Sequence, residues 1–251
     1  MKYGLVLSGG GVRGIMHLGV IKALEEFGVR FSCLSGTSAG SIIGSLYASG
    51  YTPDEIFEII GKTSFFKSLK PAWTWAGLLT MEGLESLLSD YIPENEFEKL
   101  KISMTIAATD LVRGTVRYFD KGKLVPAIMA SCCIPGIFKP YTIDNSEYVD
   151  GGILDNLPVK PVKDKCDFII GSHCNPIDNS FNKKNLKAII ERSLLMAING
   201  NTSGSKGLCN ILIEPPDVST ISGYEMSKAK TLFDIGYTYT LKSFQPQDFK
   251  D

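Results

Sequence analysis

The 251-residue sequence predicts an α/β protein with a mostly parallel central sheet and helices on both of its faces. Short apolar runs alternate with segments of helical periodicity along the chain, and glycine-rich turns stand where the first two runs pass into helices. Apolar residues make up 44% of the chain and charged residues 21%, which is enough material for a core. We expect residues 1–251 to form a single domain, because this length suits one core of this class.

The first two units repeat the same order of strand, turn and helix. Tyr3–Leu7 is a short apolar run, and after a glycine cluster the apolar residues recur at helical spacing up to Gly28. Phe31–Ser35 is the second predicted strand. The small residues of Ala39–Ala48 then predict a helix that packs closely on its neighbours. Repetition of this unit is typical of parallel sheets.

The rest of the chain continues the alternation, apart from one irregular segment. The predicted helices are Pro53–Gly61, Met81–Tyr91, Leu124–Ser131, Leu186–Ile198 and Lys228–Lys242, and the predicted strands are Ile102–Ala108, Thr115–Phe119, Phe168–Gly171 and Ile211–Glu214. In the irregular segment, Phe65–Leu79, aromatic residues lie among lysines and a proline. We interpret it as a loop or cap. Its aromatic residues and lysines suit contact with lipid or an acyl chain, and packing of the two tryptophans into a core cap is at least as common.

Charge and composition exclude several classes of partner. The chain carries 26 basic and 27 acidic residues, so it has no overall field that would attract nucleic acid. The longest uncharged stretch, Phe31–Pro53, is too rich in serine, threonine and glycine to be a transmembrane segment. The N-terminus shows no export signal, and six cysteines without a CxxC pair are expected to be reduced. We therefore expect a cytoplasmic protein, with peripheral membrane binding also open, and neither a metal nor another cofactor.

The first motif follows the first strand and reads Gly9-Gly10-Gly11-Val12-Arg13-Gly14. It satisfies the GxGxxG pattern of dinucleotide-binding turns, but the second strand ends without the acidic residue that would hold the ribose hydroxyls. We favour an anion-binding loop over a purely structural turn, because consecutive glycines let backbone N–H groups approach a negative oxygen closely. Arg13 would steady this loop or meet a substrate phosphate, and an ordinary surface arginine is the alternative.

The second motif, Gly36-Thr37-Ser38-Ala39-Gly40, lies between a predicted strand and a predicted helix. This G-x-S-x-G pattern has the form of a nucleophile elbow, in which a strained turn pushes the serine hydroxyl out of the sheet. Glycines are required at both ends because side chains there would collide with neighbouring backbone. A serine- and glycine-rich turn without chemistry is the alternative, but the position between strand and helix favours the elbow.

A serine nucleophile needs a base, and the third motif offers one. Asp150 precedes Gly151 and Gly152, in a pattern that is also compatible with a simple turn. His173 follows a predicted strand and would complete the order Ser38, Asp150, His173 of an α/β-hydrolase triad. In that class the elbow usually follows several strands and an earlier oxyanion loop, whereas Ser38 comes after only two strands. The triad therefore stays an alternative.

Taken together, these motifs resemble the patatin-like phospholipase family, lipid acyl hydrolases that use a Ser-Asp dyad. The resemblance covers the glycine loop with Arg13 and the helix start His17-Leu18-Gly19, the Gly36–Gly40 elbow, the segment Ala130-Ser131 through Ile134-Pro135-Gly136-Ile137-Phe138, and Asp150-Gly151-Gly152 with Asn156 and Pro158. It extends over about residues 3–160 in the family's order. Beyond residue 160 the sequence shows only compatible α/β alternation.

The resemblance implies a three-layer patatin-like fold and a phospholipase A-type enzyme that hydrolyses carboxylic esters of lipids or phospholipids. Its substrate would be a lipid ester at a membrane surface. The site residues that it implies are Ser38 as nucleophile, Asp150 as acid/base partner, Gly9, Gly10, Gly11, Val12, Arg13 and Gly14 as oxyanion loop, and Gly36, Thr37, Ala39, Gly40, Gly151 and Gly152 as support. Acyl transfer to an alcohol and a non-catalytic lipid-binding module remain open as other functions.

Overall fold

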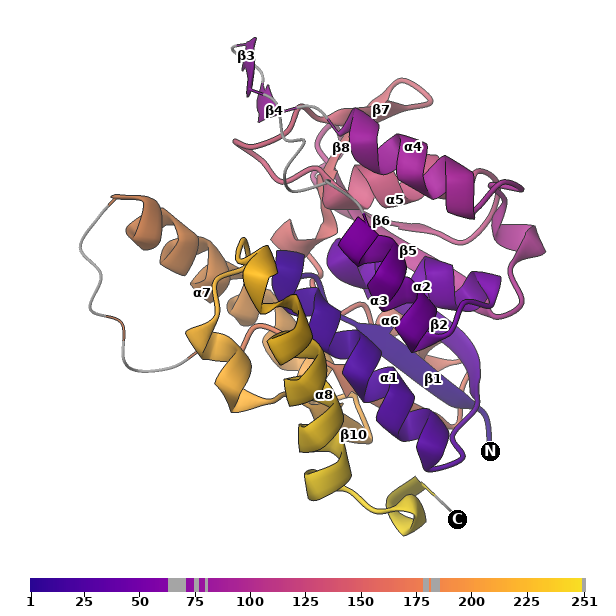
Figure 1. The fold of residues 1–251 in the computed structure, drawn as a ribbon. Coiled ribbons are helices and arrows are strands. Elements are labelled where there is room, and N and C mark those ends of the chain that lie inside the picture. The colour runs from indigo at the N-terminus through magenta and orange to yellow at the C-terminus, as the bar shows by residue number, and fades with distance from the viewer. Residues whose placement is uncertain (63–70, 75–76, 80, 178–180, 182–185, 250–251) are drawn as a thin grey trace.

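The computed structural model describes residues 1–62, 71–74, 77–79, 81–177, 181 and 186–249, and an eight-stranded sheet forms its centre (Figure 1). Its strands are β1 (Tyr3–Leu7), β2 (Phe31–Thr37), β5 (Ser103–Asp110), β6 (Thr115–Phe119), β7 (Tyr141–Ile143), β8 (Ser146–Asp150), β9 (Phe168–Ser172) and β10 (Ile211–Ile213). They lie in the order β10-β9-β1-β2-β5-β8-β7, with β6 beside β5. The strands from β10 to β5 are parallel, whereas β6 and β8 run antiparallel to β5.

Helices lie on both faces of this sheet. The α-helices are α1 (Met16–Glu26), α2 (Ala39–Ser49), α3 (Pro53–Lys62), α4 (Glu82–Tyr91), α5 (Leu124–Cys132), α6 (Lys160–Lys163), α7 (Leu186–Lys206) and α8 (Ala229–Ser243). Short 3₁₀ helices include η1 (Gly11–Ile15) and η3 (Gly151–Ile153), and β3 (Pro71–Thr74) pairs with β4 (Gly77–Leu79) as a separate ribbon. The predicted α/β class, with a mostly parallel sheet between helices, is confirmed.

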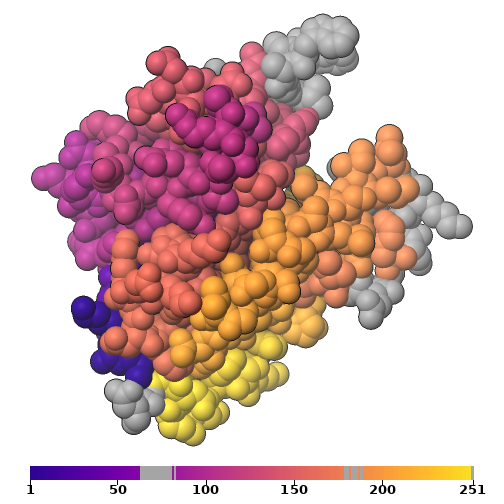
Figure 2. Space-filling model, turned by 180° about the vertical axis from the view of Figure 1, so that it is seen from behind, coloured from indigo at the N-terminus to yellow at the C-terminus, as the bar shows by residue number. Residues whose placement is uncertain are grey.

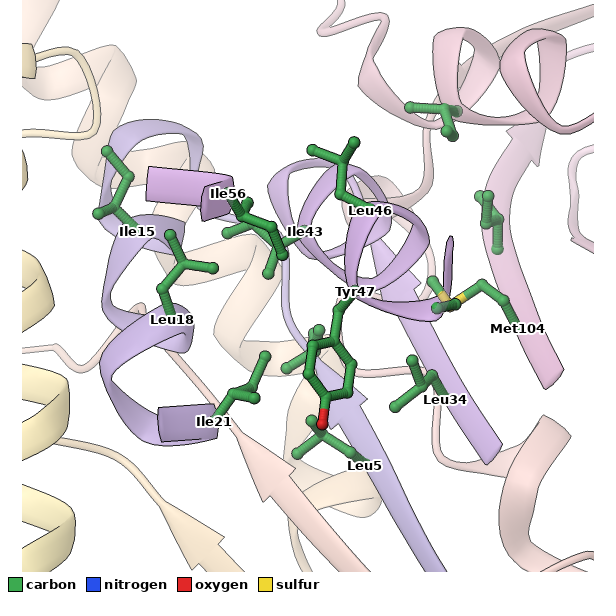
Figure 3. Packing of buried hydrophobic residues seen from close by; sticks show 14 of the residues in the cluster. Leu5, Ile15, Leu18, Ile21, Leu34, Ile43, Leu46, Tyr47, Ile56 and Met104 are labelled. Atoms are coloured by element: carbon green, nitrogen blue, oxygen red, sulfur yellow. The ribbon is translucent and has the colours of Figure 1, made fainter. Parts of the chain in front are cut away.

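Alternate residues of the central strands build two cores, because successive side chains of a strand point to opposite faces. Leu5 and Leu34 belong to the larger core, where Figure 3 shows Leu18 of α1 and Leu46 of α2 packed above the sheet. On the other face, Val6, Cys33 and Ile169 pack with Val162 of α6. The continuous apolar runs in the sequence reflect strands that are buried on both faces.

The β7–β8 hairpin and the end of α7 differ from the sequence-based expectation. The hairpin was missed because its strands are short and flank a polar run. Its turn residues Asp144 (φ 47°) and Asn145 (φ 63°) both adopt positive φ, as two-residue hairpin turns of type I′ require. Helix α7 continues beyond the predicted end at Ile198 to Lys206, since Gly200 and Gly204 interrupt the apolar pattern without ending the helix.

The cysteines correct one expectation. Cys33 on β2 and Cys166 before β9 form a disulfide, so the prediction of reduced thiols is wrong for this pair. Cys132, Cys133 and Cys174 are free and buried.

The described ranges lack two kinds of feature. They contain no helix that is both long and apolar enough to cross a membrane, and no group of three or more potential metal ligands. In the irregular segment, residues 65–79, positions 65–70 and 75–76 lie outside the described residues, so both of its interpretations, lipid contact and core packing, remain predictions.

Candidate active site

Ser38 occupies a strained turn between β2 and α2. Its backbone has φ 51° and ψ −122°, a region that non-glycine residues rarely adopt. The flanking glycines make this turn possible, because a Cβ at Gly36 would lie 2.5 Å from the Gly40 carbonyl oxygen and a Cβ at Gly40 would lie 2.3 Å from the Leu7 carbonyl oxygen. The turn therefore has the geometry that the G-x-S-x-G pattern predicts.

Hydrogen bonds to the backbone of Ser38 hold the turn in place. The Ser38 amide donates to Ser131 Oγ at 2.8 Å, and Ser131 Oγ in turn donates to the Ala107 carbonyl at 2.7 Å. The Ser38 carbonyl accepts from the Ser41 amide at 2.8 Å and from Ser41 Oγ at 2.6 Å. Since its own amide is occupied, Ser38 has no free backbone donor for a substrate oxygen. Ser131 lies in the segment that the resemblance covered, but its role was not foreseen.

Strand pairing brings Asp150 to the same edge of the sheet as Ser38. Asp150 ends β8 and pairs with Ala108 on β5, and the preceding residue, Ala107, pairs with Thr37 on β2. Asp150 is the last residue of β8, which runs antiparallel to β5. Ser38 directly follows the carboxyl end of β2, which runs parallel to β5. The two residues are 112 positions apart in the sequence, so this neighbourhood exists only in the folded sheet.

The Asp150 carboxylate is buried and faces the Ser38 hydroxyl. Burial raises its pKa from the usual 3.8 to about 6, while hydrogen bonds from the Ser38 hydroxyl and the Gly152 amide act in the opposite direction. The Gly152 amide donates to Asp150 Oδ1 at 2.8 Å, and the Asp150 amide donates to the Cys133 carbonyl at 2.8 Å. The carboxylate is therefore fixed in orientation, and its basicity exceeds that of an exposed aspartate.

The glycine loop lies beside Ser38, since a Cβ at Gly9 would come within 3.0 Å of Ser38 Cβ. Gly11 has φ 58°, and a Cβ there would lie 2.6 Å from the Gly223 carbonyl oxygen, so this position requires glycine. Among the residues that the structure describes, none accepts a hydrogen bond from the amides of Gly10 or Gly11. These two amides belong to residues that line the cavity at Ser38, and they are available to an oxyanion.

The loop is braced from three later parts of the chain. The side-chain amides of Asn156 and Asn175 both donate to the Gly9 carbonyl, at 3.3 and 2.5 Å. The Val12 amide donates to the Gly223 carbonyl at 2.8 Å. Arg13 is buried and its Nε donates to the Ile221 carbonyl at 2.6 Å, so the surface-arginine alternative is wrong. This bond ties the loop to Ile221, and contact of Arg13 with a substrate phosphate remains a prediction.

A cavity of about 80 Å³ joins these groups. Its polar lining comes from the glycine loop, Ser38, Asp150, Asn156 and Asn175. Its apolar lining consists of Ile134, Pro135, Ile153, Leu194, Leu195 and Ile198. A reactive hydroxyl and carboxylate thus open onto an apolar wall, an arrangement that suits an ester with a hydrocarbon chain.

Neither histidine lies between Ser38 and Asp150. His173 Nδ1 is 2.7 Å from Glu214 Oε1, and His173 does not line the cavity. The nitrogens of His17 bond to Ser172 Oγ at 2.7 Å and to the Ser8 carbonyl at 3.0 Å, and burial lowers its pKa to about 4. His17 is therefore a buried polar contact beside the glycine loop, and the geometry disfavours the triad with His173.

A family model described as patatin-like phospholipase matches residues 5–163. The chain belongs to the patatin-like phospholipase family. An uncharacterized NTE family protein of Mycobacterium tuberculosis is 35% identical over 163 residues, which are 64% of this chain and 45% of that protein. Lysophospholipase NTE1 of Debaryomyces hansenii is 34% identical over 187 residues, which are 70% of this chain and 12% of that protein. The chain spans less than half the length of these relatives.

The solved structure of VipD from Legionella pneumophila has the same fold. It matches with a TM-score of 0.64 and 16% sequence identity, over 96% of this chain and 66% of VipD. At this identity the likeness concerns the fold alone. The patatin-like fold that the resemblance implied is confirmed.

The patatin-like family match ends at residue 163, yet later residues complete the site. Asn175, the α7 residues Leu194 and Ile198, and the Gly223–Tyr224 pair line the cavity. None of these five residues was predicted from the sequence to have a functional role. One signal was present, because Asn175 follows closely after the carboxyl end of β9, where ligand sites of parallel sheets are usually found.

Proposed function

We propose that this patatin-like protein is a lipid acyl hydrolase that cleaves carboxylic esters through an acyl-Ser38 intermediate, with Asp150 as base. One observation carries the proposal. The buried carboxylate of Asp150 faces the hydroxyl on a strained strand-to-helix turn, and both groups line one cavity with an apolar wall. The amides of Gly10 and Gly11 at this cavity have no hydrogen-bond acceptor among the described residues. Membership of the patatin-like phospholipase family supports the same assignment.

In the first half of the proposed reaction, Ser38 Oγ attacks the ester carbonyl carbon while its proton passes to Asp150. The carbonyl electrons move onto the oxygen, which the amides of Gly10 and Gly11 stabilise. Collapse of this tetrahedral intermediate breaks the bond to the alcohol, which leaves with the proton from Asp150. The acyl group remains on Ser38.

In the second half, water attacks the acyl-Ser38 ester and gives a proton to Asp150. The same two amides stabilise the second oxyanion, the bond to Oγ breaks, and Oγ recovers its proton from Asp150 as the fatty acid leaves. Each oxyanion donor is typically worth about 3 to 4 kcal/mol. Because the Ser38 amide is bonded to Ser131, we assign this role to the glycine loop.

We propose single-chain phospholipid esters as the first substrates to test. Two features support this choice: the apolar wall formed by Ile134, Leu194 and Ile198, and the name lysophospholipase of the yeast relatives. Diacyl phospholipids and neutral lipid esters follow. A cytoplasmic location with peripheral membrane binding fits such substrates and remains a prediction from the sequence.

The purified protein should release fatty acid from at least one member of a panel of lysophosphatidylcholine, phosphatidylcholine and monoacylglycerol. The Ser38→Ala variant serves as the blank, and a fluorophosphonate probe should label the wild type but not this variant. Lipid binding without turnover would favour the non-catalytic module. An acyl ester formed with an added alcohol, at the expense of free fatty acid, would favour the transferase. Labelling that survives Ser38→Ala would overturn the assignment of the nucleophile.

A further inference from the structure

Exposed apolar side chains gather at and beside the mouth of the Ser38 cavity. Of the 13 large hydrophobic residues that are exposed within the described ranges, four lie on α7: Leu186, Ile189, Ile190 and Met196. Leu186 is 73% exposed, Ile190 58% and Met196 59%. Two more of the 13, Ile153 and Tyr224, line the cavity itself. Soluble proteins rarely leave a contiguous group of this kind uncovered unless it binds something.

The exposed face of α7 continues into the cavity wall. At 3.6 residues per turn, its four exposed residues fall within an arc of about 120° around the helix. Leu194 lies only about 40° further around than Ile190, and it lines the cavity together with Leu195 and Ile198. The N-terminal half of α7 projects from the body of the molecule in Figure 1, and it stands out in orange in Figure 2.

The other half of α7 is tied to the active site. Asn201 Nδ2 donates to the Gly152 carbonyl at 2.8 Å and to the Ile153 carbonyl at 3.1 Å, and Gly152 also bonds Asp150. Asn199 Nδ2 donates to the Asn175 carbonyl at 2.8 Å. These bonds fix the helix relative to Ser38 and Asp150. Because the helix is fixed in this way, any surface that binds the projecting half of α7 would lie beside the mouth of the cavity.

We propose that the exposed face of α7, formed by Leu186, Ile189, Ile190 and Met196, inserts into the surface of a phospholipid membrane and delivers the acyl chain to the cavity. The proposal rests on the proposed function. A lipid surface is favoured because Ile190 on this face is followed at i, i+4 spacing by Leu194 and Ile198, which line the wall that the acyl chain would contact. A second copy of the chain is a poorer fit, since four partly exposed side chains offer roughly 400 Å², against about 800 Å² per partner in a standard interface.

The test measures binding to vesicles of phosphatidylcholine by co-sedimentation, with every protein in the Ser38→Ala background so that the lipid is not hydrolysed. Adding Leu186→Gln and Ile190→Gln should lower the partition coefficient about tenfold or more, because two apolar side chains no longer enter the membrane. Leu208→Gln is the matched control. This residue is 38% exposed and lies just before the N-terminal end of β10, at the opposite edge of the sheet, so binding should be unchanged.

A second measurement does not depend on loss of binding. A tryptophan introduced by Ile190→Trp should be quenched by vesicles of brominated phosphatidylcholine, relative to the parent protein, whereas one introduced by Leu208→Trp should not. Equal partitioning of the double variant and the parent, or no binding by the parent, would overturn the proposal. A parent dimer that the double variant converts to a monomer would assign the face to a second copy instead. Turnover of a soluble monomeric ester by the wild type reports on the proposed function separately.

Discussion

Replacing Asp150 by asparagine is predicted to inactivate the protein and to make its fold more stable. Asparagine has nearly the same shape, and its carbonyl oxygen can still accept the hydrogen bond from the Gly152 amide that Asp150 Oδ1 accepts at 2.8 Å. It cannot take a proton from Ser38, so ester turnover should fall by about 10² to 10⁴. It also removes a buried charge, and this is the source of the expected gain in stability.

The size of the gain follows from the pKa of Asp150. Burial raises this pKa from 3.8 to about 6. Because the folded state binds the proton more tightly than the unfolded chain, the wild type loses stability as pH rises above 3.8, and this loss is complete above pH 6. With these two pKa values, the buried charge of Asp150 lowers the free energy of unfolding of the wild type by about 3 kcal/mol at pH 7 and about 1.5 kcal/mol at pH 5. The free energy of unfolding of the Asp150→Asn variant should exceed that of the wild type by these same amounts.

Urea denaturation followed by circular dichroism, at pH 7 and pH 5, measures this difference. The Asp164→Asn variant, altered at an exposed aspartate, should match the wild type at both pH values. The turnover of a soluble ester by the wild type should also fall about tenfold from pH 7 to pH 5, as protonation of a group with pKa about 6 removes the base. The reasoning is refuted if Asp150→Asn is no more stable than wild type at pH 7, or if its advantage does not shrink at pH 5.

Three further predictions concern the surroundings of Asp150. Ser38→Ala should abolish ester turnover and fluorophosphonate labelling, whereas His173→Gln should retain most turnover in the same assay; comparable losses would restore the triad. Ser131→Ala removes the acceptor for the Ser38 amide and should lower kcat about tenfold with little change in KM, and an unchanged kcat in steady-state kinetics would show that this contact does not position the serine. Gly10→Ala would place a methyl group 2.3 Å from a buried thiol sulfur and displace the loop, so kcat should fall about 10² to 10³, whereas Gly61→Ala, with open space around it, should have no effect.

The turn at Ser38 could be predicted from five residues because its constraints are local. The strained turn at Ser38, between β2 and α2, requires glycine at positions 36 and 40. Both glycines are visible in the sequence itself. The position of Asp150 was only partly predictable. Its motif was visible, but the hairpin that carries it was missed, and its approach to Ser38 depends on the pairing of β8 with β5.

The bracing of the glycine loop had no local signal. Gly223 matters because its carbonyl accepts from the Val12 amide and lies where a side chain at Gly11 would project. Asn175 matters because its side chain bonds the Gly9 carbonyl. Both contacts join parts of the chain that are far apart in sequence, and a glycine or an asparagine in a loop has many other uses. Such partners become visible only when the sheet places them side by side.

Three unfavourable features share one edge of the sheet: the positive φ of Ser38, the buried charge of Asp150, and the amides of Gly10 and Gly11, which have no acceptor in the part of the chain that the structure describes. Each would be destabilising if it stood alone. In the proposed reaction, a tetrahedral ester intermediate would offset the last two features. Its oxyanion would accept hydrogen bonds from the two amides, and its formation would transfer the Ser38 proton to Asp150. With a pKa of about 6, Asp150 is still mostly ionised at neutral pH, yet it accepts a proton more readily than an exposed aspartate. The remaining mismatch between its pKa and that of an alcohol is large, so in the proposed reaction the glycine loop, rather than the base, would supply the greater part of the rate enhancement.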